Sequence, residues 1–208
     1  MTKPEFIARQ SRCPTGLLGG VVARVMARET RAENRRALDL LDLEDGDSLL
    51  DIGCGHGETL RYADRMVRLS RGVGVDFSGV MVRLARKRNR AAVWDTRLSF
   101  HCADSANLPS PNNRFSKALS VHTVYFWSGP AAHLAEAFRI LIHGGRFLLC
   151  YRSSADARAL KDYPDTIYRF PSVAEVEKEL AKAGFASIQT ETADISGRLT
   201  HWTISRRI

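Results

Sequence analysis

The chain has 208 residues, enough for one domain with a small addition. Hydrophobic residues make up 44% and charged residues 26%, a balance that fills a core and excludes a disordered or collagen-like chain. The net charge of +8 would suit a polyanionic partner, but no zinc-finger spacing or RNP-like aromatic run accompanies it, so we expect an arginine-rich solvated surface and no nucleic-acid partner.

No apolar run approaches the ~18 residues of a membrane-spanning helix, and the N-terminus lacks the apolar region of a secretion signal. A cytoplasmic protein, monomeric or homodimeric, is therefore expected. The four cysteines lie far apart without a C-x-x-C pair. Because Cys54, Cys102 and Cys150 lie in or beside apolar runs, we expect buried, reduced thiols and no metal site.

The first 44 residues precede the first strong strand. Residues 1–14 are polar and contain two prolines, which predicts a loosely held arm. Apolar residues at helical spacing predict helices over 15–28 and 30–42, the second with Ala37, Leu38 and Leu41 facing inward. We expect residues 1–44 to form a helical lid. Packing on the sheet edge is an alternative, and the amphipathic stretch 16–28 leaves peripheral membrane contact open.

Strands and helices then alternate along the chain. The predicted strands are Ser48–Ile52, Gly72–Val75, Arg97–Cys102, Ser116–Val121 and Arg146–Tyr151. The predicted helices are His56–Val67, Ser78–Arg90, capped by Ser78, and Pro130–Ile142, stopped by Gly144-Gly145. Short connections between such elements indicate a parallel sheet covered on both faces.

The C-terminal part departs from this alternation. Residues 153–171 are polar and contain Pro164 and Pro171, and a capping box from Ser172 to Glu175 opens a helix that ends at Gly184. Two further strands, Ala186–Thr192 and Leu199–Ser205, flank a hairpin signal at Ser196-Gly197. We therefore predict an α/β fold over residues 45–208: a doubly wound, Rossmann-like, seven-stranded and mostly parallel sheet that ends in an antiparallel hairpin, preceded by the N-terminal helices.

The most informative stretch is the loop after the first strand, Leu49-Leu50-Asp51-Ile52-Gly53-Cys54-Gly55-His56-Gly57. Glycine at every second position allows a tight turn and close approach of a ligand, and the free N–H groups of the following helix favour an anionic group. A dinucleotide fingerprint would need glycine where Glu58 stands, and an apolar residue in place of Asp51. A nicotinamide-dependent oxidoreductase remains an alternative.

At this point the sequence resembles the class I S-adenosylmethionine-dependent methyltransferases, and within them the group that methylates small molecules and lipids. Three further segments carry the resemblance at the expected spacing: Gly74-Val75-Asp76-Phe77-Ser78, Cys102-Ala103-Asp104-Ser105-Ala106-Asn107-Leu108-Pro109, and Ala137–Phe147, which includes His143-Gly144-Gly145-Arg146. Together with the glycine loop they span roughly residues 45–150. The family's proline before the two glycines is replaced by His143.

The resemblance implies S-adenosylmethionine as the cofactor and assigns residues to it. The glycine loop and Asp51 would hold the amino-acid end, Asp76 the ribose diol, Phe77 and Met81 the adenine face, and Asp104 with the Ser105 N–H the adenine edge. The cofactor residues expected on this basis are Asp51, Gly53, Cys54, Gly55, Gly57, Asp76, Phe77, Met81, Asp104, Ser105 and Val121.

The acceptor side is expected after the fourth strand, where residues 120–128 read Ser-Val-His-Thr-Val-Tyr-Phe-Trp-Ser. His122, Tyr125 and Trp127 are the candidates for the pocket wall, with His122 and Tyr125 as catalytic candidates. His122 is a candidate base for an acceptor hydroxyl or thiol, and a packed histidine is the alternative. Alignment of the nucleophile with the sulfonium can suffice without a base.

We therefore expect a methyltransferase that acts on a small-molecule or lipid-like acceptor. An RNA methyltransferase and a non-catalytic S-adenosylmethionine-binding protein are the alternatives. The sequence does not define the acceptor or the methylated atom. The basic run Arg83, Arg86, Lys87, Arg88 and Arg90 is interpreted as a solvated helix face rather than an RNA patch.

Overall fold

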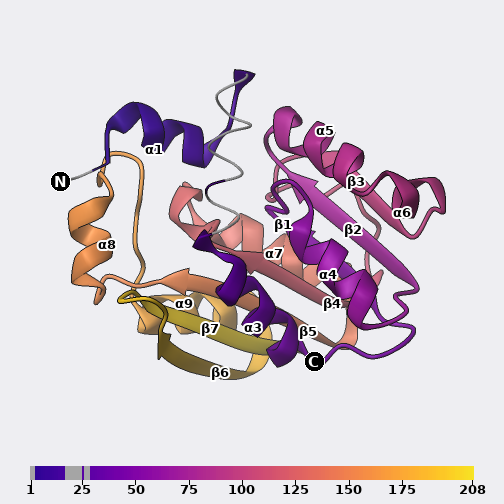
Figure 1. Ribbon diagram of the computed structural model, residues 1–208. Coiled ribbons are helices and arrows are strands. Elements are labelled where there is room, and N and C mark those ends of the chain that lie inside the picture. Colours follow the sequence, from indigo (N-terminus) through magenta and orange to yellow (C-terminus); the bar gives the residue numbers. More distant parts are fainter. Residues whose placement is uncertain (1–2, 17–24, 26–28) are drawn as a thin grey trace.

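The computed structural model describes residues 3–16, 25 and 29–208. Its centre is a seven-stranded sheet in the order β3-β2-β1-β4-β5-β7-β6, in which only β7 runs antiparallel to its neighbours (Figure 1). The predicted fold class is thereby confirmed. The strands are β1 Ser48–Ile52, β2 Arg71–Asp76, β3 Leu98–Cys102, β4 Phe115–Val121, β5 Leu141–Arg152, β6 Phe185–Asp194 and β7 Leu199–Arg207.

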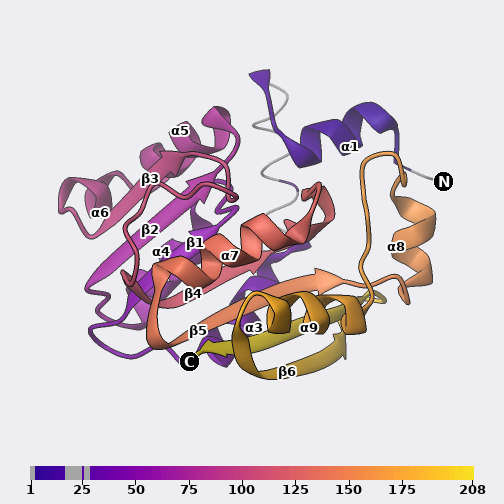
Figure 2. The ribbon, with the colours of Figure 1, turned by 180° about the vertical axis from the view of Figure 1, so that it is seen from behind.

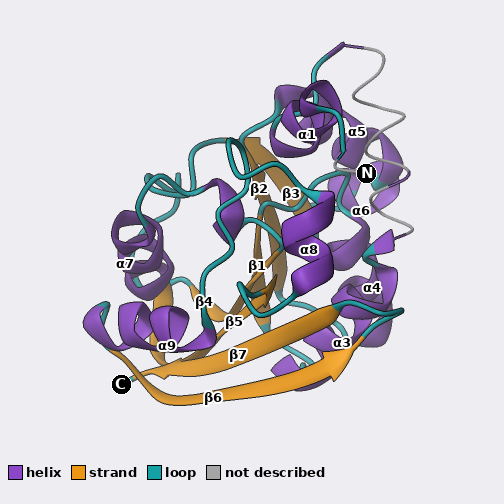
Figure 3. Ribbon diagram, turned by 90° about the vertical axis from the view of Figure 1, so that its left-hand side faces the viewer, coloured by secondary structure: helices purple, strands orange, loops and turns teal. Residues whose placement is uncertain are grey.

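Helices cover both faces of the sheet (Figures 2 and 3). The first face carries α3 (Arg31–Leu41), α4 (Glu58–Met66), α5 (Gly79–Arg88) and the short α6 (Arg90–Trp94), whose apolar residues form one core cluster with Leu49, Leu148 and Trp202. The opposite face carries α7 (Pro130–Ile140) and α9 (Val173–Lys182), which pack on Leu50, Phe147 and Phe185. Burial of these two apolar layers is what closes the sheet from solvent.

The strand order fixes where a ligand can bind. From β1 the chain winds outward through β2 to β3 and then returns to β4 on the other side of β1. The connections that follow β1 and β4 therefore diverge to opposite faces, and they leave a crevice at the carboxyl ends of these strands. In open α/β sheets this switch point is the usual ligand site.

Several elements differ from the sequence-based predictions. The predicted arm 1–14 is wrong in part, because Glu5–Arg12 forms helix α1, in which Ala8 is fully buried. The polar segment after β5 contains helix α8 (Ala157–Asp162), and a 3-10 turn η1 (Val124–Phe126) follows β4. The main-chain N–H of Lys3 donates to the carbonyl of Asp162, so the start of the described chain is attached to α8.

The fifth strand also begins earlier than predicted. Leu141 pairs with Phe115, and the register then shifts across a bulge to the pair Arg146–Lys117. Gly144 takes a φ of 79° within this irregular part of β5. The two glycines thus permit a bend inside the strand instead of separating it from α7, which ends at Ile140.

The N-terminal lid predicted over residues 1–44 divides between two locations. Helix α3 packs on the sheet as part of the first layer, with Ala37, Leu38 and Leu41 buried as predicted. The indole N–H of Trp202 donates to the carbonyl of Glu33 over 3.1 Å, which fixes α3 against β7. Helix α1 lies beside α8 in Figure 1. The helix predicted over 15–28 falls mostly outside the described residues.

The predictions for the cysteines and for membrane-spanning helices can be compared with the structure. Cys54 and Cys150 are buried as expected, whereas Cys102 at the end of β3 is exposed, which corrects the prediction for that residue. All four cysteines are free thiols. Across the described ranges no helix combines the length and the apolar character needed to cross a membrane.

Substitution of Leu38 tests the placement of α3 in the core. Because the Leu38 side chain is completely buried among sheet residues, Leu38→Ala is expected to lower the free energy of unfolding by about 2–5 kcal/mol in urea titrations. The control is Asp39→Ala on the exposed side of the same helix, for which a change within about 0.5 kcal/mol is expected. A loss of unfolding free energy for Leu38→Ala as small as that for Asp39→Ala would show that α3 contributes little to the core.

Candidate cofactor and acceptor site

A cavity of about 370 Å³ opens at the carboxyl ends of β1, β2 and β4, at the switch point of the sheet. Its walls come from the loops after these strands, from the end of α1 and from the start of α3. Most of the predicted site residues line it. These are Asp51, Gly53, Cys54, Gly55, Asp76, Phe77, Met81, Asp104, Ser105, Val121, His122 and Trp127.

The glycine loop is held in a shape that requires two of its glycines. Gly53 has a φ of 78°, and a Cβ atom there would lie 2.1 Å from Thr123 Cγ2. Gly57 has a φ of 75° at the N-terminus of α4, and a Cβ atom would lie 2.7 Å from the Phe100 ring. Gly57 thus lies against the core, whereas Gly53 and Gly55 line the cavity. Side chains at Gly53 and Gly57 would both clash and strain the backbone.

Asp76 links this loop to the start of the next helix. Its Oδ2 accepts the main-chain N–H of Gly55 and its Oδ1 accepts that of Ser78, each over 2.8 Å. Burial raises the pKa of this carboxyl group, and the two hydrogen bonds oppose that rise. The carboxylate is therefore fixed in orientation at the tip of β2, and each oxygen retains acceptor capacity toward the cavity.

Asp51 is the more deeply placed acid, with 2% of its surface exposed. Burial, reinforced by the nearby negative charge of Asp76, raises the pKa of Asp51 to about 7. Its Oδ2 is buried without a hydrogen-bond partner among the described residues. A cationic or donor group bound in the cavity would satisfy this oxygen and relieve the repulsion between the two carboxylates.

The far wall is built around an aromatic stack. The ring of His133 lies parallel to Trp127 with centroids 4.7 Å apart, and its Nδ1 is 2.7 Å from the Ser105 hydroxyl. Asp104 lies at the rim with Oδ1 3.9 Å from the same nitrogen. Phe77 is 67% exposed at the mouth, whereas Met81 is buried below it. An apolar, planar ligand group would find ring faces and a thioether on these walls.

His122 and Tyr125 contact each other behind the cavity. The Tyr125 hydroxyl accepts the main-chain N–H of Arg152 over 2.6 Å, and it lies 2.8 Å from His122 Nδ1. Because Tyr125 is buried, its own proton needs an acceptor, and Nδ1 is the one within reach. This assigns the ring proton of neutral His122 to Nε2. Burial and two arginines lower the pKa of His122 to about 3, so the ring is neutral.

This arrangement bears on the catalytic roles expected for both residues. With Nδ1 bonded to Tyr125 and Nε2 protonated, the ring presents a donor rather than a free lone pair. His122 also has a φ of 57°, a strained conformation for a residue other than glycine, which the loop maintains at the cavity wall. Tyr125 is outside the set of described residues that line the cavity, and its hydroxyl contacts His122 instead.

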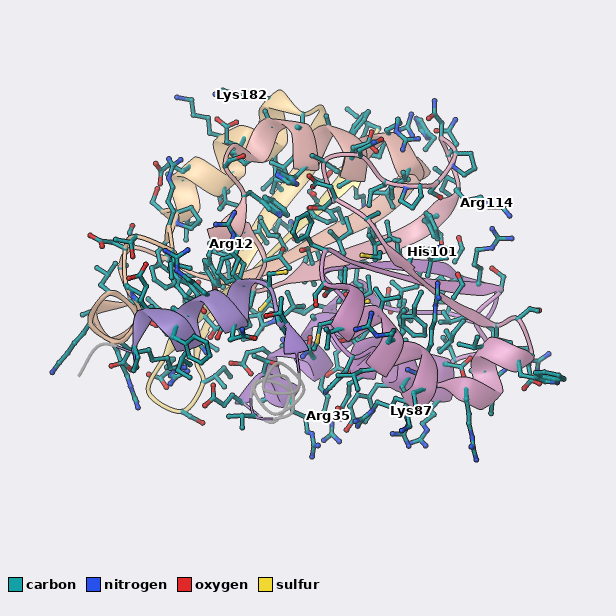
Figure 4. The ribbon with its side chains drawn as sticks, turned by 90° about the horizontal axis from the view of Figure 1, so that it is seen from above. Arg12, Arg35, Lys87, His101, Arg114 and Lys182 are labelled. Atoms are coloured by element: carbon teal, nitrogen blue, oxygen red, sulfur yellow. The ribbon has the colours of Figure 1, made fainter. Side chains whose placement is uncertain are left out.

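Sequence reasoning missed several residues of the site. Arg12, seen at the end of α1 in Figure 4, lines the cavity with Asn34 and His133, and no local pattern marks them. Behind the wall, Glu33 and Arg152 are buried close to His122. For Glu33 a signal did exist, because it lies four residues before Ala37 on the inward stripe of its helix. No group of three or more metal-binding side chains occurs in the described part of the chain.

Comparison with known proteins identifies the family. A family model described as a methyltransferase domain matches residues 50–149. The chain is 31% identical over 188 residues to 27-O-demethylrifamycin SV methyltransferase of Amycolatopsis mediterranei, covering 84% of this chain and 66% of that protein. It is 31% identical over 121 residues to a fatty-acid O-methyltransferase of Mycolicibacterium smegmatis, covering 58% and 41%. It thus spans under two thirds of the length of these relatives.

The fold has a full-length counterpart among solved structures. A proposed methyltransferase, solved in complex with the Haloferax volcanii Trm112 methyltransferase activator, superposes with a TM-score of 0.77, at 23% identity and with 99% of both chains covered. With the glycine loop, the acid at the tip of β2 and the family match in one molecule, the chain belongs to the class I S-adenosylmethionine-dependent methyltransferases. The cofactor of this family is S-adenosylmethionine.

The residues present suit that cofactor. Its amino group is a cation that the unpartnered oxygen of Asp51 can accept, and its ribose diol matches the oriented carboxylate of Asp76. The ring faces and Met81 offer apolar cover for adenine. The assignment of each residue to a part of the cofactor stays a prediction, which two measurements address.

Asp51 should give the protein a distinctive pH dependence. Between its ordinary pKa of 3.8 and the folded value of about 7, the folded protein holds a proton that the unfolded chain releases. Raising the pH through this window should therefore lower the free energy of unfolding, by up to ~1.4 kcal/mol per pH unit. Urea titrations of Asp51→Asn should show a flatter dependence on pH. An unchanged slope would contradict the buried, protonated state of Asp51.

Asp76 should carry a large share of the cofactor affinity. Removal of a carboxylate that accepts hydrogen bonds should weaken S-adenosylmethionine binding by about 1.5–3 kcal/mol in calorimetric titrations of Asp76→Ala. Asp104→Ala, at the solvent-exposed rim, serves as the matched control with a smaller expected loss. Circular dichroism establishes that both variants are folded. Undiminished affinity in folded Asp76→Ala would remove Asp76 from the site.

Proposed function

We propose that the protein transfers the methyl group of S-adenosylmethionine to a small-molecule or lipid-like acceptor. One observation carries most of this proposal: a single cavity is bounded by the glycine loop with its two acids on one side and by His122, Phe126 and Trp127 on the other. The first set suits the polar cofactor, and the second offers a largely aromatic wall beyond it. The rifamycin and fatty-acid methyltransferases among its relatives support this acceptor class.

In this proposal the bound cofactor supplies an electrophilic methyl group on a sulfonium. The protein's task is alignment and exclusion of water. Asp51 and the loop amides would hold the amino-acid end, and Asp76 would hold the ribose. His122, held by the hydroxyl of Tyr125, would present its Nε2–H as a donor. Tyr125 is then a positioning residue, and the proton that leaves the acceptor needs another destination.

Nucleic acid is a weaker candidate for the acceptor. On α5, the guanidinium of Arg86 donates to the carbonyl of Phe100 at 3.0 and 2.5 Å, and Arg88 pairs with Glu58 over 2.9 Å. Two of the five side chains of the predicted basic run are thus engaged within the fold. Lys87 and Arg35 extend outward along the same edge of the molecule in Figure 4, and the Arg35 guanidinium stacks on the Tyr62 ring at 4.9 Å.

Cofactor preference is the first test of the proposed function. A thermal-shift screen should show stabilisation by S-adenosylmethionine and S-adenosylhomocysteine and none by NAD, since Glu58 occupies the position that the dinucleotide loop gives to glycine. The loaded protein is then incubated with a metabolite extract, and mass spectrometry identifies the compound that gains a methyl group. Stabilisation by NAD alone would overturn the function, and methylated RNA would favour the alternative acceptor.

A further inference from the structure

A second cavity, of about 310 Å³, lies between α7 and α9. Figure 3 shows these two helices side by side on one face of the sheet. The β4 loop, the later part of β5 and the segment before α9 complete its walls. None of the residues predicted for the cofactor is among its described lining residues, and Trp127 is the one described residue that lines both cavities. The second cavity is therefore a separate space whose wall includes one side chain of the first.

The interior of this second cavity is apolar. Leu134, Leu149 and Val176 line it, and each is almost completely buried in the fold. The buried side-chain polar atoms that lack a partner among the described residues all belong to residues outside its lining, whereas Asp51 supplies one to the cofactor cavity. A hydrocarbon group inside the second cavity therefore needs no hydrogen bonds, and it displaces water that apolar walls hold weakly.

The mouth of the cavity carries two acids and two cations. Both acids have partners: Glu175 Oε2 accepts a main-chain N–H at the start of α9 over 2.7 Å, and Glu179 pairs with Lys182 over 2.6 Å. Lys178 is exposed and forms no ion pair within the described part of the chain. Arg169, with 71% of its side chain exposed, reaches Glu175 only at 4.0 Å, and an exposed pair at that distance contributes little. Both cations thus remain available to an anionic group at the mouth.

We propose that this cavity is a second ligand site that takes a fatty carboxylate, with the hydrocarbon chain between α7 and α9 and the carboxylate beside Lys178 and Arg169. The volume falls within the range of about 300–1,000 Å³ typical of small-molecule sites. A carboxylate accepts charge-assisted hydrogen bonds from both cations, a hydroxyl group accepts weaker ones, and an ammonium group is repelled. The site is additional to the methyltransferase function, because the ligand binds there without any group transfer.

Trp127 links this site to the wall expected for the acceptor. Its ring stacks on His133 with centroids 4.7 Å apart, and both residues line the cofactor cavity. Because Trp127 also lines the second cavity, a chain bound there packs against a residue of the acceptor wall. The same residue reports on occupancy, since Trp94 is 86% exposed and Trp202 is buried in the core cluster of the opposite face of the sheet.

Three probes that share one chain and differ in head group test the site: dodecanoate, 1-dodecanol and dodecylamine. Calorimetry measures their binding, below micelle-forming concentrations, to the protein loaded with S-adenosylhomocysteine, so that the cofactor cavity is filled. We expect dodecanoate to bind at least ~5-fold more tightly than either other probe. Lys178→Gln should remove most of this preference. Lys87→Gln, which makes the same change of charge on α5, should leave it intact (Figure 4).

A second set of variants tests where the chain lies. Val176→Trp places an indole ring in the cavity and should weaken dodecanoate binding at least ~10-fold, while S-adenosylhomocysteine affinity stays within ~2-fold. Val173→Trp is the control, because Val173 belongs to the same helix and lies outside the described lining. Dodecanoate should also change the tryptophan fluorescence of the wild-type protein, and this change should be absent from Trp127→Phe.

The outcomes are distinct. Equal affinity for the three probes, or a preference that Lys178→Gln retains in full, overturns the proposal. Undiminished binding to folded Val176→Trp, or a fluorescence change that persists in Trp127→Phe, overturns it as well. Binding of none of the probes contradicts it and leaves the cavity to a peptide segment or a second copy of the chain. Should Val176→Trp not fold, the exposed substitution Lys178→Gln decides. Loss of methyl transfer or of cofactor binding concerns the proposed function alone.

Discussion

The carboxylate of Asp76 is the interaction on which the site depends. One oxygen accepts from the glycine loop that follows β1, and the other accepts from the first turn after β2. These two hydrogen bonds join two βα connections at the point where the sheet changes direction. They add to the main-chain N–H groups of Gly53 and Cys54, which both donate to the carbonyl of Val75, so that the loop is bonded to the end of β2 through three successive residues. This side of the cavity is therefore built from main-chain groups, and Asp76 joins its two loops.

The second side of the cavity depends on how buried charge is arranged. His122 is neutral because it is buried beside arginines. Its tautomer follows from the Tyr125 hydroxyl, which in turn is oriented by the main-chain N–H of Arg152 at the end of β5. The orientation of one ring in the cavity thus depends on the last residue of the neighbouring strand, β5.

Hydrophobic periodicity and glycine spacing were enough to predict all seven strands and five of the helices that cover or precede the sheet, since these patterns follow directly from burial. The family resemblance predicted eleven cofactor residues, and ten of them line the cavity together with His122 and Trp127, whereas Gly57 lies outside it. Short elements such as α1, η1 and α8 were missed because tertiary contacts, including the bond from Lys3 to Asp162, stabilise them. The pairing of Glu33 with Arg152 joins residues 119 positions apart, and no local pattern encodes such a contact.

The N-terminal segment is attached at both ends of its described part. The main-chain N–H of Lys3 donates to Asp162 of α8, and the carbonyl of Pro14 accepts from the Ser78 hydroxyl, which also caps α5 beside Asp76. Between these attachments, Ser11 and Arg12 form part of the cavity wall. Because it is bonded at two points, this part of the wall moves away from the cavity only when one of the two hydrogen bonds breaks. Because Ser78 bonds both to Pro14 and to the Asp76 carboxylate, movement of this part of the wall is mechanically coupled to the glycine loop that Asp76 holds.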